Sequence, residues 1–287
     1  MRPNHAAGPT VAITGVGGYL GSCVAGHFVA AGWRILALGR RPAADQSSVP
    51  FRLGDEISPE PLRGAQALVH CAYDFSVIRP AEVMRVNVEG TRKLFAAARL
   101  AGIPRLVCVS SISAFDGCRS VYGQAKLAIE EIARLSGALT VRPGLIWGDP
   151  PGGTFGRLVE QVTGARVVPL IGDGSQIQFL VHRDDLADLI VRYCTGTMPP
   201  PSAPLTVAHA RPWPFRELLR AIAEPGGRSP IFLPLPWRLI WGGLRAAEWL
   251  RLPLNFRSDS VVSLMNQNPA SDLTGAERLG ITCRPFR

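Results

Sequence analysis

Short apolar segments alternate with longer helical segments along the first two thirds of the chain, and this alternation restricts the fold more than any other feature. The segments with strand character are 10–14, 33–38, 51–53, 67–72, 105–110 and 138–143, and those with helical character are 18–32, 81–102 and 120–137. Nearly continuous apolar strands separated by helices of this length indicate a parallel sheet with both faces covered. We therefore predict an α/β fold, a doubly wound parallel sheet whose ligands bind at the carboxyl ends of the strands.

The stretch TGVGGYLG (14–21) lies directly between the first strand and the first helix. Its glycines permit a tight turn, let backbone N–H groups approach a pyrophosphate, and allow close packing of the helix on the sheet. A glycine-rich turn without a ligand is the alternative, but this position after a first strand is typical of a dinucleotide site. We predict a Rossmann-type domain whose cofactor contacts this loop at Thr14, Gly15, Gly17, Gly18, Tyr19, Leu20 and Gly21.

The end of the second strand, LALGRR (36–41), bears on the choice between NAD and NADP. An NAD site places an acid near this point to accept hydrogen bonds from the adenosine ribose, and this stretch contains none. Gly39 leaves room, while Arg40 and Arg41 supply positive charge for a 2′-phosphate. We predict NADP as the cofactor in preference to NAD; a purely solvated role for Arg41 is the alternative.

The regular alternation ends near Pro150. Segments at 154–164, 212–224 and 236–252 have helical character, and they are mixed with Pro/Gly-rich connectors and short strands such as 205–209. We predict two units: an NAD(P)-binding Rossmann domain at 8–150 and a smaller substrate-binding lobe at 151–287. We expect this lobe to be partly interleaved with the end of the sheet.

Composition and charge exclude several classes of function. The chain is 47% hydrophobic and 18% charged, as in globular proteins, and it has no apolar run long enough to cross a membrane. The net charge of +9 comes from arginines spread over the whole chain, which favours an anionic small molecule over nucleic acid. The six cysteines are dispersed, and the N-terminus has no apolar signal segment. We expect a cytoplasmic protein without a metal site.

The segment 231–254 carries three of the six tryptophans together with three arginines. One interpretation is a helix that lies in a membrane interface. Because the apolar residues do not keep to one clean face, we favour burial of this helix against the lobe. Peripheral membrane contact stays open as the alternative.

Lysine is rare in this chain: Lys93 and Lys126 are the only two among 31 basic residues. Lys126 follows Tyr122 by four residues in SVYGQAK (120–126), so both side chains lie on one face of a predicted helix. A fixed ammonium favours the phenolate of a neighbouring tyrosine, which makes the phenol a usable acid and base. The preceding strand ends at Ser110 and Ser111, where a hydroxyl can hold a substrate carbonyl oxygen. A chance Tyr/Lys pair on a solvated helix is the alternative.

With these motifs in place, the chain resembles the extended short-chain dehydrogenase/reductase superfamily and its NAD-dependent epimerase/dehydratase family. The similar stretches are TGVGGYLG (14–21), GD (54–55), LVHCA (68–72), NVEGTRKLFAAARLAGIPRLVCVSS (87–111), YGQAK (122–126), RPGLIWG (142–148), IGDGSQIQFLVHRDDLADLI (171–190) and SDLTGAERLGI (271–281). They extend over nearly the whole chain.

The resemblance implies roles for four catalytic residues. Tyr122 is expected to be the general acid and base, and Lys126 to bind the nicotinamide ribose and tune Tyr122. Ser111, rather than Ser110, matches the position that holds the substrate oxygen. Asn87 matches an asparagine that orders the active-site helix and proton relay, although a purely structural contact is an open alternative.

The resemblance also extends the set of expected cofactor contacts. Asp55 matches a residue near adenine, with a turn or cap as its alternative role. Cys71 and Ala72, the last two residues of the strand expected at 67–72 and of the LVHCA stretch, are expected cofactor contacts, and Pro143 matches the segment that lines the nicotinamide. Tyr122 and Lys126 belong to the cofactor set as well.

Departures from the family pattern narrow the activity. No Asp-Glu pair follows Ser111, so dehydration lacks its acid and base, and RPG (142–144) replaces an asparagine-containing segment of several nucleotide-sugar enzymes. We expect an NAD(P)-dependent oxidoreductase acting on a carbonyl or secondary alcohol, with 4-keto reduction of a nucleotide-linked sugar as the leading reaction. The alternatives are a nucleotide-sugar epimerase with tightly bound NAD and a non-catalytic NADP-binding module. A homodimer is also left open.

Overall fold

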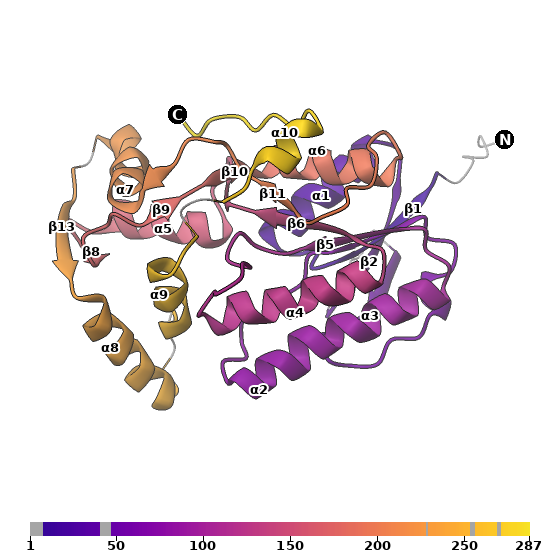
Figure 1. The fold of residues 1–287 in the computed structure, drawn as a ribbon, viewed down its shortest axis with the longest axis horizontal. Coiled ribbons are helices and arrows are strands. Elements are labelled where there is room, and N and C mark those ends of the chain that lie inside the picture. The colour runs from indigo at the N-terminus through magenta and orange to yellow at the C-terminus, as the bar shows by residue number, and fades with distance from the viewer. Residues whose placement is uncertain (1–7, 41–46, 228, 253–255, 269–270) are drawn as a thin grey trace.

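Seven parallel strands form the central sheet of the computed structural model, which describes residues 8–40, 47–227, 229–252, 256–268 and 271–287. Their order across the sheet is β11-β6-β5-β4-β1-β2-β3 (Figure 1). The bounds are β1 Thr10–Thr14, β2 Arg34–Gly39, β3 Ser47–Pro50, β4 Ala67–His70, β5 Arg105–Val109, β6 Leu139–Pro143 and β11 Leu205–Val207. The order reverses direction at β1 and β4, whose carboxyl ends therefore bound a crevice. The predicted doubly wound α/β fold is confirmed.

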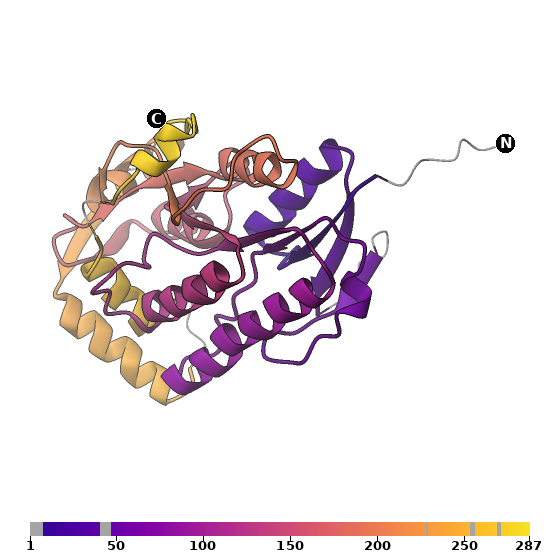
Figure 2. The ribbon, with the colours of Figure 1, turned by 45° about the vertical axis from the view of Figure 1, so that its right-hand side comes forward.

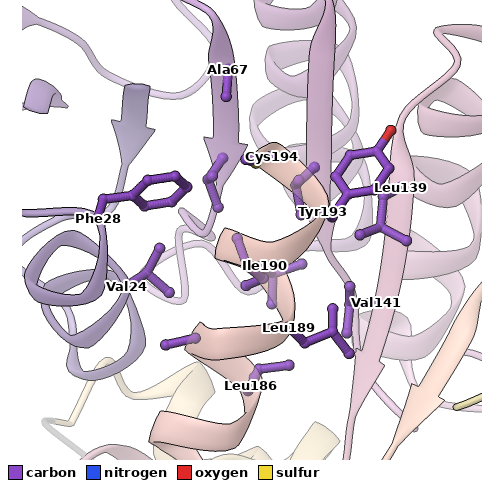
Figure 3. Packing of buried hydrophobic residues seen from close by; sticks show 14 of the residues in the cluster. Val24, Phe28, Ala67, Leu139, Val141, Leu186, Leu189, Ile190, Tyr193 and Cys194 are labelled. Carbon is purple, nitrogen blue, oxygen red and sulfur yellow. The ribbon is translucent and has the colours of Figure 1, made fainter. Parts of the chain in front are cut away.

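Helices cover both faces of this sheet (Figure 2). Helices α1 (Tyr19–Ala30) and α6 (Arg183–Cys194) pack on one face, and α3 (Glu89–Leu100) and α4 (Val121–Leu135) pack on the other. Alternate strand residues serve the two faces: Val11 and Ile13 join the cluster of α1 and α6, whereas Ala12 joins that of α3 and α4. Figure 3 shows α6 beside α1, with the buried side chains of both helices packed in one cluster with those of the strands. Strands that are apolar on both sides are the reason the sequence reads as continuous apolar runs.

The helix expected at 81–102 is built from three pieces. A short α2 (Pro80–Val83) continues through a π-helical turn at Met84–Val88 into α3. Asn87 lies in this π-turn and is almost completely buried. Such turns are frequent at functional sites because they redirect a side chain that a regular helix would hold elsewhere.

The smaller lobe contains helices α5 (Gly153–Gly164), α7 (Phe215–Ala223), α8 (Trp237–Trp249) and α9 (Ser258–Met265), all visible on one side of Figure 1. Its strands pair two by two; they are β7 (Leu145–Trp147), β8 (Val167–Ile171), β9 (Ile177–Gln178), β10 (Leu180–His182), β12 (Trp213–Pro214) and β13 (Ile231–Leu235). A short α10 (Thr274–Arg278) lies beside β11. Helix α6 and strand β11, which follow residue 150, belong to the layers of the main sheet.

Two expectations about individual segments are wrong. The strand expected at 51–53 is instead β3 at Ser47–Pro50, because its partner β2 ends at Gly39, whose carbonyl oxygen accepts a last hydrogen bond from the Phe51 nitrogen. The helix expected to be buried against the lobe is α8, and none of its residues is buried. Within the described parts of the chain, no helix is both long and apolar enough to cross a membrane.

A chain of buried hydrogen bonds runs beneath the glycine loop. His70 Nδ1 lies 2.7 Å from Thr14 Oγ1, and His70 Nε2 lies 3.0 Å from Thr91 Oγ1. Thr91 donates its hydroxyl proton to the Asn87 carbonyl oxygen at 2.7 Å, so it accepts from His70 Nε2–H, and Nδ1 accepts from Thr14. Burial, with the nearby Lys126 ammonium, lowers the pKa of His70 from 6.5 to about 3. His70 is thus held as a neutral imidazole.

We expect this imidazole to make the fold acid-sensitive. Below pH 6.5 His70 is protonated in the unfolded chain but stays neutral in the folded protein. The free energy of unfolding therefore falls as the pH falls. His70→Gln keeps a donor and an acceptor but cannot titrate. Between pH 7 and pH 5 the wild type should lose about 2 kcal/mol more than this variant, as measured by urea unfolding. Equal losses in the two proteins would contradict the proposed neutral state.

The glycine loop depends on one close approach. A side chain at Gly21, in the first turns of α1, would collide with the Gly15 carbonyl oxygen, and Gly15 itself has a φ of +71°. A Cβ atom on Gly15 would lie 3.0 Å from the Ala72 backbone nitrogen. The loop can therefore sit against both α1 and the end of β4 only with glycine at these positions.

Two glycines of the same helix give a matched test of this contact. Gly21→Ala should lower the free energy of unfolding by about 1–3 kcal/mol, because backbone must move. Gly26→Ala, at an exposed position of α1 with nothing within 4 Å, should raise it by about 0.5–1 kcal/mol through helix propensity. Thermal or denaturant unfolding of both variants measures the contrast, and two changes of the same sign would refute the packing argument.

Candidate active site

The glycine loop presents uncapped backbone donors at the edge of the sheet. Gly18 is the N-cap of α1; no side chain accepts a hydrogen bond from the first turn, and no acid lies there. The free N–H groups and the positive end of the helix dipole are suited to a pyrophosphate. The predicted loop contacts therefore occupy a position that fits a dinucleotide. Tyr19 differs from the others: its ring lies under Arg183, with the guanidinium carbon 5.2 Å from the ring centroid, and its hydroxyl is buried without a partner among the described residues.

The neighbouring edge of the sheet holds the residues predicted for the adenosine end. Arg40 follows β2 and is exposed, whereas Arg41 lies outside the described residues. Arg40 and Arg52 act on Asp74: burial raises the pKa of this carboxyl, but hydrogen bonds from Ser76 and these two guanidinium groups hold it below its usual range. Arg40 therefore lies close enough to Asp74 to stabilise its carboxylate.

Asp55 is exposed on a loop that packs against α3. The loop backbone at Gly54 lies directly against Gly90 of α3, and Lys93 Nζ donates to the Gly54 carbonyl oxygen at 3.1 Å. Lys93 also pairs with Glu56 at 2.6 Å. One of the two lysines therefore positions the loop that carries Asp55.

The second lysine, Lys126, is buried beside the end of β5. Its Nζ donates to the Val109 carbonyl oxygen at 2.8 Å. The same atom lies 4.9 Å from the ring centroid of Tyr73 and 5.9 Å from that of Tyr122. A compact ammonium can enter this space between a carbonyl and two ring faces, whereas a planar guanidinium fork needs more room.

Tyr122 stands at the start of α4 in an aromatic cluster. Its ring packs edge-to-face on Tyr73 at 5.0 Å between centroids and lies 5.7 Å from Phe75. Burial raises the pKa of the Tyr73 phenol, so Tyr73 stays protonated. Tyr73 and Phe75 did not enter the expected site; their position just after the LVHCA stretch was the available signal. Phe75 is 63% exposed and adds an apolar surface beside Tyr122.

The start of α4 is held by a residue from the smaller lobe. Asp259 of α9 accepts hydrogen bonds from the backbone nitrogens of Val121 and Tyr122 at 2.8 and 3.0 Å. Ser120, the N-cap, accepts from the Gly123 nitrogen at 3.0 Å. Asp259 thus fixes the backbone of Tyr122 from a position 137 residues away in the chain. No local motif could have revealed this contact.

The structure separates the roles of the two serines that follow β5. Ser110 is buried and donates to Glu130 Oε1 at 2.5 Å, and Arg142 binds both oxygens of the same carboxylate at 2.8 and 2.6 Å. Ser111 is half-buried, and its Oγ accepts from the Ser113 nitrogen at 3.1 Å. The Ser111 hydroxyl proton therefore has no assigned acceptor among the described residues, which suits a group that binds a substrate oxygen.

Asn87 holds the segment that carries the aromatic cluster. Its Oδ1 accepts from the Asp74 nitrogen at 2.7 Å, and its Nδ2 donates to the Asp74 carbonyl oxygen at 3.2 Å. Both ends of the amide are thus committed to the loop after β4. In this geometry Asn87 acts by positioning Tyr73 and Phe75.

The remaining predicted cofactor contacts, Cys71, Ala72 and Pro143, lie at the carboxyl ends of β4 and β6. Pro143 is buried, and its carbonyl oxygen accepts from the Ile112 nitrogen at 3.0 Å, which ties β6 to the serine loop. Cys71 and Ala72 lie against Gly15, and burial raises the pKa of the Cys71 thiol to about 12. Cys71 is therefore an inert thiol that shapes the crevice.

Helices α1 and α6 bring together one group that sequence spacing did not suggest. The donor atoms of Cys23, His27 and Asp184 lie within 4.8 Å of one another, and His27 Nδ1 is 2.7 Å from Asp188. Cys23 donates to Asp184 Oδ1 at 3.2 Å, and its pKa is raised to about 12 by burial and by that carboxylate. A protonated thiol and the arginines beside Asp184 fit a hydrogen-bonded joint between two helices better than a cation site.

The chain is similar to a known family and to several curated proteins. A family described as "NAD dependent epimerase/dehydratase family" matches residues 11–201. A ceramide reductase of Caulobacter vibrioides is 30% identical over 79% of this chain and 73% of its own length. A dTDP-4-dehydro-6-deoxy-D-allose reductase of Streptomyces bikiniensis is 28% identical over 88% of this chain and 92% of its own.

A solved structure shares the fold. The structure described as MoeE5 in complex with UDP-glucuronic acid and NAD superposes with a TM-score of 0.74 at 21% identity, covering 96% of this chain and 94% of that one. The matched family extends over more than half of the sequence and includes the glycine loop and the Tyr122/Lys126 pair. The protein is therefore an enzyme of the extended short-chain dehydrogenase/reductase type and belongs to the NAD-dependent epimerase/dehydratase family.

Proposed function

We propose that the protein is an NAD(P)-dependent oxidoreductase that interconverts a ketone and a secondary alcohol, with Tyr122, Lys126 and Ser111 as its catalytic residues. The observation that carries the proposal is the buried Lys126, held by the Val109 carbonyl and facing the rings of Tyr73 and Tyr122. A buried ammonium without a carboxylate partner among the described residues is costly unless a ligand or reaction uses it.

Each residue has one task in this reaction. The nicotinamide cofactor supplies or accepts the hydride at the carbonyl carbon. In the reducing direction Tyr122 Oη gives its proton to the oxygen that becomes the alcohol, and the Lys126 ammonium stabilises the phenolate left behind. Ser111 Oγ donates a hydrogen bond to the same substrate oxygen. Asn87 and Asp259 position Tyr122 and its aromatic neighbours.

For the cofactor we propose NADP. Support comes from the absence of an acid at the end of β2, in LALGRR, and from the exposed Arg40. The solved neighbour that contains NAD argues for the unphosphorylated form, so the choice depends on Arg40.

For the substrate we propose a nucleotide-linked 4-keto sugar, in line with the reductase relative named for a dTDP-linked sugar. Two buried polar atoms of the lobe support a polar ligand, because Arg216 Nε and Gln176 Oε1 have no partner among the described residues. A long-chain ketone is the second candidate. It is favoured by the apolar ring of Phe75 beside Tyr122 and by the relative named ceramide reductase.

An epimerase is distinguished from a reductase by its redox balance. An epimerase returns the hydride to the same substrate, so it copurifies with NAD and shows no net oxidation of added NADPH. A non-catalytic module would bind the dinucleotide without any turnover. Screening NADPH oxidation with keto-sugars and with 3-keto sphingoid or fatty-acyl ketones separates these outcomes.

Tyr122→Phe, Lys126→Arg and Ser111→Ala test the catalytic assignment. Tyr122→Phe keeps the ring and removes the proton, so turnover should fall by roughly 10²–10⁴-fold while NADPH affinity is retained. Lys126→Arg should also lower turnover, because the guanidinium does not fit the space beside the Val109 carbonyl.

Ser111→Ala should lower turnover by roughly 10²-fold at unchanged NADPH affinity, and Ser110→Ala serves as the comparison that disturbs only the Glu130 cluster. Near wild-type turnover in Tyr122→Phe would reject the mechanism.

Arg40→Ala tests the cofactor assignment. Loss of a charge-assisted hydrogen bond to a 2′-phosphate costs about 1.5–3 kcal/mol, so NADPH binding should weaken by about tenfold or more while NADH binding stays nearly unchanged. Arg52→Ala is the matched control, because it removes the other guanidinium that acts on Asp74. Equal losses for the two cofactors in Arg40→Ala would reject the NADP preference.

A further inference from the structure

Helix α8 and the segments beside it form an exposed apolar surface at the outer edge of the lobe, away from the sheet (Figure 1). Fourteen large hydrophobic residues are exposed among the described residues, and eight of them lie between Ile231 and Phe256. These eight are Ile231, Leu233, Leu239, Trp241, Trp249, Leu250, Leu252 and Phe256. We call this set the α8 surface. Such a concentration within one stretch of the chain marks an interaction site.

One side of the helix is exposed along its whole length, while the other side packs against α9. Leu239 is 71% exposed and Trp249 is 83% exposed, and no residue of α8 is buried. Ala246 lies seven residues after Leu239 and three before Trp249, so these three share the outward side of the helix. Exposing the apolar side of a whole helix to water costs free energy, which is recovered when that side is buried in another molecule or in a lipid layer.

The exposed charged side chains between Ile231 and Leu252 are arginines, and one of them, Arg245, lies 3.7 Å from the carboxylate of Glu248. Between Ile231 and Leu252 the chain has three arginines, Arg238, Arg245 and Arg251, and one acid, Glu248. Glu248 is turned inward, where it accepts from the Ser258 nitrogen at 2.9 Å and the Ser258 hydroxyl at 2.7 Å; its side chain is only 8% exposed. Arg238 and Arg245 are seven residues apart and flank the apolar side together.

We propose that the α8 surface binds the interface of an anionic lipid bilayer. Tryptophan and leucine enter the boundary between headgroups and acyl chains, and arginines at the same level pair with lipid phosphates. A second copy of this chain fits less well, because a two-fold contact would bring the arginines of both copies together without an exposed acid to pair with them. The proposal is independent of the substrate assignment.

The α8 surface is also connected to the catalytic helix. Glu248 of α8 holds Ser258 at the start of α9, and the next residue, Asp259, holds the backbone of Tyr122. The α8 surface and the backbone of Tyr122 are thus connected through two carboxylates and the first residues of α9.

Vesicle co-sedimentation of the full chain tests the proposal. We expect binding to phosphatidylcholine vesicles that contain about one third phosphatidylglycerol, and at least about tenfold weaker binding to pure phosphatidylcholine or at high salt. Leu239→Asp/Trp249→Asp should lose about tenfold or more of this affinity. Arg238→Gln/Arg245→Gln should remove most of the dependence on the anionic lipid.

The matched control is Leu100→Asp/Leu135→Asp. These leucines are 72% and 60% exposed on α3 and α4, so the control adds the same charge at similar exposure elsewhere, and it should bind vesicles like the wild type. Circular dichroism and NADPH binding check that each variant is folded; the arginine variant keeps the test valid if the aspartate variant is not. No vesicle binding by the wild type, or equal loss in both aspartate variants, overturns the proposal. So does a wild-type dimer that only Leu239→Asp/Trp249→Asp dissociates, which would assign the surface to a second copy.

Discussion

The buried ammonium of Lys126 is the interaction around which the crevice is organised. It has a single hydrogen bond, to the Val109 carbonyl, and no ion pair with a carboxylate among the described residues. Its field reaches well beyond Tyr122: together with burial it helps keep His70 neutral, and it opposes the effect of burial on the thiols of Cys71 and Cys108. A charge that is left uncompensated in the interior favours an anion or a developing oxyanion beside it.

The glycine loop and the loop after β4 are connected by buried hydrogen bonds. Thr14 at the end of β1 contacts His70 at the end of β4, and His70 contacts Thr91 behind the π-turn that carries Asn87. Asn87 in turn holds the loop of Tyr73 and Phe75. The glycine loop and the loop that carries Tyr73 and Phe75 are therefore joined by one set of hydrogen bonds.

The smaller lobe supplies two acidic residues that hold the start of α4 in place. Asp259 caps the catalytic helix from outside the Rossmann layers, and Glu248 anchors the residue before it. In a helix whose first N–H groups would otherwise face the crevice, two carboxylate hydrogen bonds stabilise the position of the Tyr122 backbone. Because these acids reside on α8 and α9, the orientation of Tyr122 depends on how the lobe is packed.

The sequence by itself determined the layered fold and the relative position of Tyr122 and Lys126. Apolar strands that alternate with helices admit only a parallel sheet, the loop 14–21 needs glycine where Gly15 and Gly21 meet, and the spacing of Tyr122 and Lys126 is a property of one helix. The tertiary structure decided everything that depends on contacts between distant segments. It paired Ser110 with Glu130, left the Ser111 hydroxyl proton without an acceptor among the described residues, and brought Asp259 to the start of α4. It also left one side of α8 exposed, although its composition suggested burial. The spacing of apolar residues in the sequence indicates which side chains favour burial, but it does not indicate which segment of the chain packs against them.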